Sequence, residues 1–183
     1  YSLLLRYDTE HNSKIIGDLA DSWTVSPDGL AYTFKIREGV KFHDGSDLTA
    51  EDIKATYDRI RNPPQGVTSL RQAEFVDVES IDTPDAHTVV FKLSNPNSGF
   101  LSSLTSPWNC IYSAALLKSD PNYPKSRVMG SGPFEFVSHE RGARWVSKRF
   151  ENYFQKGQPY LDGLETVIMQ SANALVNAIS GGQ

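Results

Sequence analysis

Apolar and polar residues alternate on both sides of a Ser-Pro-Asp-Gly segment at positions 26–29. Trp23 and Val25 stand before the segment, and every second residue from Tyr32 to Ile36 is apolar after it. Successive side chains of a strand point to opposite faces, so each run predicts a half-buried strand. Proline presets φ at a central turn position and glycine accepts a positive φ, so the segment predicts a tight turn. The stretch therefore predicts a β-hairpin with one buried face.

The next stretch combines strand, turn and helix signals. Val40 and Phe42 continue the alternation, which predicts that they finish the second strand. Asp44-Gly45 then supplies the chemistry of a turn. A helix is expected to follow over residues 49–61, where apolar residues recur at helical spacing and the run ends before a pair of prolines.

The start of this helix carries a complete set of capping signals. Thr49 is the expected N-cap, and Asp52 takes the third helical position, where a capping box usually has Glu or Gln. Leu48 and Ile53 are spaced to form a hydrophobic staple across the cap. The acidic residues of the first turn also favour the positive end of the helix.

Further elements are expected along the rest of the chain. Strands are predicted at 3–8, 75–81, 88–94, 134–139, 144–150 and 164–169, and helices at 99–104, 113–118 and 171–180. For the last helix we expect Ser171 as the N-cap and an inward face formed by Ala174, Leu175, Ala178 and Ile179.

These elements predict a mixed α/β to α+β chain in two parts. Strands dominate the first half, helical turns occupy the middle, and a unit of three strands and a helix closes the chain. The Gly-Ser-Gly-Pro segment marks a boundary near Val128 to Gly132, so the expected parts are residues 1–130 and 131–183.

Composition excludes several classes of function. The 183 residues carry a formal net charge of −4 and contain no basic run, which argues against nucleic acid or an anionic membrane as a partner. The apolar runs are too short to span a bilayer. Cys110 is the single cysteine, so neither an internal disulfide nor a cysteine zinc cluster is possible.

His43 and Asp44 raise the possibility of a metal site or an acid/base pair. Adjacent residues of an extended chain point to opposite faces, and a metal site needs further ligands that converge. The other histidines have neither the helical spacing nor the motif of a zinc protease. A role in holding the turn is the favoured alternative.

Two loops are further candidates for binding. Gly130 to Phe134 could cradle a phosphate, but it lacks the Walker lysine, so a crossover between two parts of the chain is favoured. Ser106 to Cys110 places Trp108 beside Pro, Ser and Asn, a combination that binding sites use. The alternative for Trp108 is a place in the core.

Residues 19–60 resemble the signature stretch of bacterial extracellular solute-binding proteins of family 5. The segments TVVFKLSNPNSGFLSSL, GSGPFEF and ENYFQKGQPYLDGL match that family in the same order. Two departures are that Gly17 replaces a usual proline and Ser131 a usual threonine. The residues that carry the match within 19–60 are Leu19-Ala20, Ser22-Trp23, Asp28-Gly29, Tyr32-Thr33-Phe34, Arg37, Gly39-Val40, Phe42-His43-Asp44-Gly45 and Leu48-Thr49-Ala50-Glu51-Asp52.

The resemblance implies a fragment of a class II-like periplasmic-binding-protein fold with mixed sheets and flanking helices. Residues 1–130 would be an extra subdomain beside the first lobe, and residues 131–183 the start of the return into that lobe. Family members are more than twice as long, so the second lobe would be absent. We expect a signal or lipid attachment sequence to precede Tyr1.

The resemblance also implies a function without catalysis, metal or cofactor. The parent protein would bind a peptide or similar small solute, in the periplasm or lipid-anchored outside the cell, and present it to the permease of an ABC importer. The matching positions expected at the ligand are Ser106, Trp108, Asn109, Gly130 and Ser131. A metal-dependent hydrolase using His43 and Asp44, and an interaction module that needs no ligand, remain the alternatives.

Overall fold

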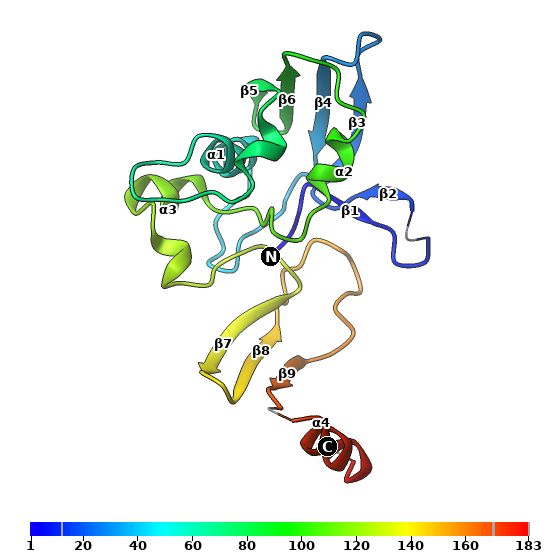
Figure 1. Cartoon of the computed structure of the whole chain (residues 1–183), viewed down its shortest axis with the longest axis vertical. Helices are drawn as coiled ribbons and strands as arrows, with labels where there is room; N and C mark the ends of the chain where they lie inside the picture. Colours follow the sequence, from blue (N-terminus) through cyan, green and yellow to red (C-terminus); the bar gives the residue numbers. More distant parts are fainter. Residues whose placement is uncertain (12, 170, 183) are drawn as a thin grey trace. The chain divides into compact units, whose positions relative to one another are not determined.

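The computed structural model describes residues 1–11, 13–169 and 171–182. They form two compact units, which we call the first unit (residues 1–132) and the second unit (residues 133–183), both drawn in Figure 1. The division falls at the Gly-Ser-Gly-Pro segment, beside the boundary expected from the sequence. The assignment of these units to a subdomain and a lobe of a longer protein stays a prediction.

The first unit is built on antiparallel sheets. The hairpin around the Ser-Pro-Asp-Gly turn is confirmed, and Gly29 has the positive φ of 72° that this turn requires. The main sheet has the strand order β3-β4-β6-β5, and a smaller sheet pairs β1 with β2. The strands are β1 (Leu5–Tyr7), β2 (Ile15–Gly17), β3 (Ala20–Val25), β4 (Ala31–Ile36), β5 (Val78–Asp85) and β6 (Thr88–Leu93).

One face of the main sheet carries the aromatic core. Tyr32, Phe34 and Ile36 of β4 are buried, as their alternation predicts. Phe91 of β6 lies edge-on to Phe34 at 5.7 Å and to Tyr57 of the first helix at 5.2 Å between ring centroids. Each edge-to-face pair adds about 0.5–1.5 kcal/mol beyond the burial of its surface. The core therefore joins sheet and helix through aromatic contacts.

Helix α1 (Ala50–Arg61) begins where its capping signals predict. Thr49 is the N-cap, and the carboxylate of Asp52 accepts a hydrogen bond from the Thr49 backbone N–H at 2.7 Å. Leu48 and Ile53, the expected staple, are both buried. The acidic run after His43 therefore has a structural task at the helix start.

The strand predicted to reach Phe42 ends earlier, at Ile36. Gly39 has a φ of 71°, which takes the chain out of the extended conformation before Val40. Val40 and Phe42 are still buried, but they lie in a loop whose two sides pair at an isolated β-bridge between Lys41 and Asp47. The alternation predicted burial correctly and strand continuation wrongly.

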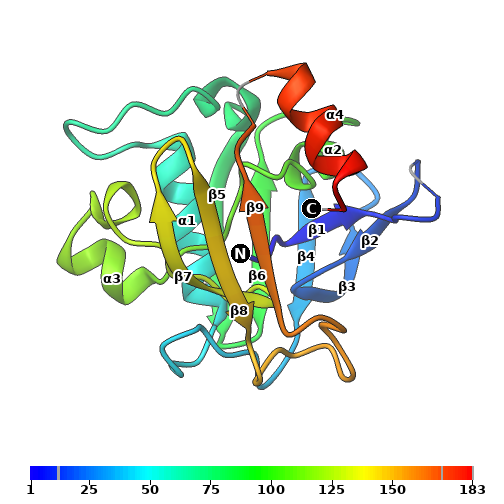
Figure 2. The same ribbon diagram turned by 90° about the horizontal axis from the view of Figure 1, so that it is seen from below.

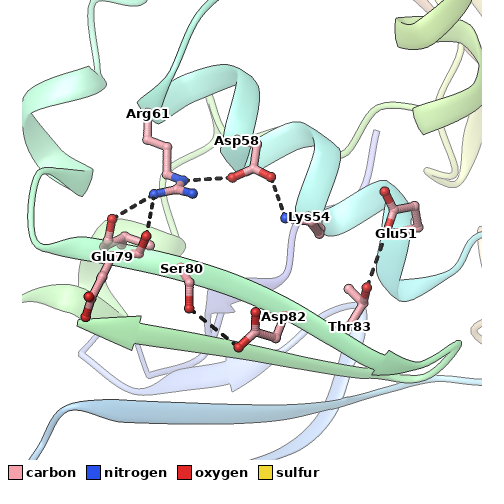
Figure 3. Close-up of polar contacts among 9 residues, drawn as sticks. Glu51, Lys54, Asp58, Arg61, Glu79, Ser80, Asp82 and Thr83 are labelled. Carbon is pink, nitrogen blue, oxygen red and sulfur yellow. Dashed lines mark hydrogen bonds and ion pairs between the residues drawn. The ribbon is translucent and has the colours of Figure 1, made fainter. Parts of the chain in front are cut away.

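Ionic and polar contacts join one side of α1 to β5 (Figure 3). Arg61 donates from Nη1 to the backbone carbonyls of Val78, at 2.9 Å, and Glu79, at 3.1 Å. Its Nε donates to Asp58, which also accepts from Lys54, both at 2.7 Å. Arg61 therefore holds the last turn of the helix against the sheet.

Short helices complete the first unit. Helices α2 (Phe100–Leu104) and α3 (Ala114–Ser119) lie where the sequence predicts them. Strand β2 and two single turns of 3-10 helix, η1 (Gln72–Phe75) and η2 (Tyr123–Lys125), were not predicted from the sequence.

The second unit contains the strands and helix expected at the end of the chain. Figure 2 shows its antiparallel strands side by side, in the order β7-β8-β9. Ser171 caps the helix, since its hydroxyl accepts a hydrogen bond from the N–H of Ala174. The elements are β7 (Phe134–Glu140), β8 (Arg144–Arg149), β9 (Gly163–Val167) and α4 (Ala172–Ser180).

The inward face predicted for α4 is wrong for this chain. Leu175 and Ile179 are 49% and 67% exposed, and no residue of the helix is buried. Apolar spacing predicts which face of a helix seeks cover but not whether a partner is present. Within the described residues, no helix is both long and apolar enough to cross a membrane.

Candidate ligand-binding site

A cavity of about 560 Å³ lies beside the C-terminal half of α1. Its volume falls in the range of about 300–1,000 Å³ that is usual for small-molecule sites. Three segments far apart in the sequence form its walls. The lining residues are Thr56, Arg59, Ile60, Val67, Thr68, Ser69, Leu70, Arg71, Trp108 and Tyr112.

Helix α1 supplies the first wall of this cavity. Thr56, Arg59 and Ile60 share one face because residues three and four apart are neighbours on a helix. The Thr56 hydroxyl donates to the Asp52 carbonyl at 2.8 Å and accepts from the backbone N–H of Tyr112 at 2.9 Å. This hydrogen bond ties the loop that bears Tyr112 to the helix.

Aromatic side chains form the second wall. Trp108 is 77% exposed, so the alternative that it belongs to the core is wrong. Tyr112 is held edge-on between Tyr1, at 5.6 Å, and Tyr123, at 6.0 Å. Burial raises the pKa of Tyr112 to about 12, although the positive charge of Arg59 acts in the opposite direction. The phenol is therefore neutral at physiological pH.

The loop from Val67 to Arg71 forms the third wall. Leu70 is 94% exposed. Arg71 forms an ion pair with Glu74, and its Nε is buried without a hydrogen-bond partner among the described residues. Burial raises the pKa of Tyr57, and the positive charge of Arg71 opposes that shift.

Ser106 and Asn109 shape the loop that carries Trp108 instead of lining the cavity. Asn109 is fully buried, its backbone N–H donates to the Ser106 carbonyl at 3.0 Å, and its amide nitrogen donates to the Ser103 carbonyl at 2.8 Å. These bonds close a tight loop, and Trp108 is left exposed at its tip. Ser106 and Asn109 therefore position the Trp108 side chain.

Gly130 and Ser131 lie against the first residues of the chain. A Cβ at Gly130 would stand 2.7 Å from the ring of Tyr1, so only glycine permits this approach. The Ser131 carbonyl accepts from the Ser2 hydroxyl at 3.1 Å, and the Ser131 side chain is fully buried. Neither residue lines the cavity, although Tyr1 touches the ring of Tyr112, which does.

The structure gives His43 and Asp44 separate local contacts. The Nε2 of His43 lies 2.9 Å from the Gly132 carbonyl oxygen, and its backbone N–H donates to the Gly130 carbonyl. Asp44 accepts from the hydroxyl and backbone N–H of Ser46, and these bonds lower its pKa. Across the described part of the chain, no three His, Cys, Asp or Glu residues come together as metal ligands would.

Of the residues that line the cavity, Trp108 alone was predicted at the ligand from the sequence. Arg59 and Ile60 carried a visible signal, since they share a helix face with the buried start of α1. The loop at 67–71 also carried one, an apolar Leu70 between a serine and an arginine in a polar segment. Neither signal shows that the loop lies opposite the helix.

Comparison with known proteins adds the family context. A family model described as bacterial extracellular solute-binding proteins, family 5 Middle, matches residues 14–183. The chain is 34% identical over 164 residues to the glutathione-binding protein GsiB of Escherichia coli O1:K1, which covers 90% of this chain and 31% of GsiB. It is 33% identical over 185 residues to a putative ABC transporter peptide-binding protein of Brucella ovis, covering 98% of this chain and 34% of the relative.

Solved structures show the same fold. The chain superposes with a TM-score of 0.91 and 36% identity on AgaA of A. tumefacien R10, solved in complex with agropinic acid. It superposes with a TM-score of 0.88 and 29% identity on the oligopeptide-binding protein AppA of Bacillus subtilis, solved with a nonapeptide. Both matches cover 100% of this chain and 36% of the other. The chain thus spans about a third of the length of the relatives it matches, and the fold expected from the sequence is confirmed.

Proposed function

Because the chain belongs to family 5 of the bacterial extracellular solute-binding proteins, we propose that it forms part of a protein that binds a small solute for an ABC-type importer. The observation that carries this proposal is the cavity of α1, with Trp108 exposed on a loop that Asn109 and Thr56 hold in place. Small-molecule sites are lined mainly by apolar and aromatic side chains with a few polar groups, and this cavity has that composition. The solute is a peptide or a similar small molecule, and no covalent step is involved.

The cavity supplies one side of the solute site in this account. Small-molecule sites usually bury about 70–90% of a ligand's surface. A chain that spans about a third of its relatives offers only part of such a surface. We therefore expect weak binding by residues 1–183 and tight binding by the longer protein.

Location and partners follow from the same family. The proposed site of action is the periplasm or the outer surface of the cell membrane, with the protein tethered there by lipid in the second case. The permease of the importer is the proposed partner that receives the solute. The name of a relative as an ABC transporter peptide-binding protein supports this partner.

A solute screen on the longer protein encoded around this chain tests the proposal. Calorimetry with dipeptides, tripeptides, glutathione and sugar acids is expected to find a solute that binds saturably at one site. Deleting the gene is expected to abolish uptake of that solute by intact cells. The hydrolase alternative predicts instead a stoichiometric metal and a turnover that His43→Ala removes. The interaction-module alternative predicts a permease complex that forms equally well without solute.

A further inference from the structure

The charged residues that line the cavity beside α1 are all positive. Its described lining contains two arginines, Arg59 and Arg71, and no carboxylate. Glu74 pairs with Arg71 but lies outside the lining. Arg59 forms no ion pair with a carboxylate within the described part of the chain. A cavity with a local positive charge in a chain of net charge −4 indicates an anionic occupant.

Apolar and aromatic side chains line the cavity beside these arginines. Trp108 presents most of its indole to solvent, and Ile60, Val67 and Leu70 line the same space. Indole faces favour stacking on planar groups and contact with apolar chains. Tyr112 also lines the cavity. The cavity therefore combines two cationic groups with apolar and aromatic surface.

We propose that the cavity takes a carboxylate-bearing part of the solute, with the carboxylate at Arg59 and Arg71 and an adjoining planar or apolar group on Trp108. This inference rests on the proposed function and specifies the class of solute that the site selects. Arginine suits a carboxylate because its planar guanidinium presents two parallel N–H donors.

The position of α1 favours a singly charged group over a phosphate. Arg59 and Ile60 belong to the last turn of the helix, which ends at Arg61. The C-terminal end of a helix carries a partial negative charge, so a dianion there is repelled more than a monoanion. Phosphate sites instead use the positive helix start and backbone N–H groups.

A matched pair of small probes tests the inference on the 183-residue chain. Phenylacetate and phenylacetamide have nearly the same shape but differ in charge. Binding is followed by NMR at the indole N–H signals, where Trp108 reports on the cavity. Trp23 packs on Phe34 and Trp145 on Phe136, so their signals serve as internal references. Phenylacetate is expected to shift the Trp108 signal saturably, with a Kd at least about tenfold lower than that of phenylacetamide.

Arginine variants identify the groups that receive the charge. Arg59→Gln and Arg71→Gln are each expected to remove most of the preference for phenylacetate, while Arg59→Lys keeps part of it because the charge remains. Arg141→Gln, an exposed residue of the β7-β8 turn, is the matched control and should leave the preference unchanged. The dispersion of the amide signals shows whether each variant is folded.

Two results would overturn the inference, and both differ from a failure of the proposed function. Equal shifts by the acid and the amide would refute the carboxylate but leave the cavity as a binding surface. The site would be refuted if phenylacetate, at concentrations up to tens of millimolar, left the Trp108 signal unshifted. This holds whether or not the signals of Trp23 or Trp145 shift. The proposed function fails separately, when the longer protein binds no solute and its deletion leaves uptake intact.

Discussion

The carboxylate of Asp52 accepts a hydrogen bond from the backbone N–H of Ala114 at 2.8 Å, across 62 positions of the chain. Its other oxygen accepts from the N–H of Thr49. One buried side chain therefore closes the start of α1 and also holds the first N–H of α3. The loop from Thr105 to Ser113, which bears Trp108, is thereby anchored at its C-terminal end to α1, the helix that lines the cavity.

Replacing Asp52 by alanine should destabilise the chain by about 3 kcal/mol, because two backbone N–H groups lose an acceptor in a buried place. Urea denaturation followed by circular dichroism measures the loss. Asp47→Ala is the matched control, since Asp47 makes an exposed ion pair with Lys41 and should cost less than about 1 kcal/mol. Equal losses in the two variants would contradict the anchoring role of Asp52.

The buried carboxyl group of Asp18 should make the stability of the fold depend on pH with a sign opposite to that of an ordinary ion-paired carboxylate. Burial raises its pKa above the usual 3.8, although the N–H of Leu3 and nearby positive charges act against the shift. The folded state then holds the proton more tightly than the unfolded state, so this contribution to stability is fully present below pH 3.8 and is lost as the pH rises through the raised pKa.

The difference in unfolding free energy between the parent and Asp18→Asn isolates this effect. Relative to the variant, the parent should lose stability as the pH rises from about 3.8, and the difference should level off above the raised pKa. The amide oxygen of asparagine still accepts from Leu3. A parent that gains stability relative to the variant over this range would contradict the sign.

Gly17 lies where the backbone passes close to Ala20. A Cβ at this position would stand 2.0 Å from the backbone oxygen of Ala20. Gly17→Ala should therefore destabilise the chain by about 2 kcal/mol or more, since backbone atoms must move. Gly99→Ala is the control, because its Cβ would meet Asn97 at an ordinary 3.4 Å. A melting temperature that falls no further for Gly17→Ala than for the control would refute the steric account.

Arg61 holds the last turn of α1 in place, and that turn carries the cavity residues Arg59 and Ile60. Arg61→Gln should cost about 1–2 kcal/mol through loss of its bonds to the carbonyls of β5. Amide exchange at Arg59 and Ile60 should also become faster, because the last turn is released. Lys54→Gln, which loses only a surface pair with Asp58 on the same helix, should cost less than about 0.5 kcal/mol. Unchanged exchange at Arg59 would show that Arg61 does not hold the wall.

Local signals in the sequence were enough to predict the hairpin of β3 and β4 and the start of α1. Alternation, turn residues and capping residues all act over a few positions, and Phe34 and Thr49 lie where these rules place them. The strand end near Phe42 was missed because the positive φ of Gly39 overrides the alternation. The inward face of α4 was wrong because its residues carry no information about what covers them.

The cavity could not be predicted, because no local rule joins its three walls. Arg59, Leu70 and Trp108 meet through the packing of α1, η1 and the loop before α3, and the aromatic core fixes that packing. Trp108 was recognisable because it stands in a loop beside Pro, Ser and Asn, a combination that binding sites use. The contribution of Asn109 to its position depends on a buried hydrogen bond, which residue type alone does not indicate.

The affinity of the longer protein for its solute, measured by calorimetry with and without Trp108→Ala, tests the central claim most directly. If the cavity of α1 is one side of the solute site, the variant should bind at least about tenfold more weakly, as loss of a buried aromatic contact does. Val137→Ala, an exposed residue of β7, should bind like the parent. A solute that binds equally well to the parent and to Trp108→Ala would contradict the account.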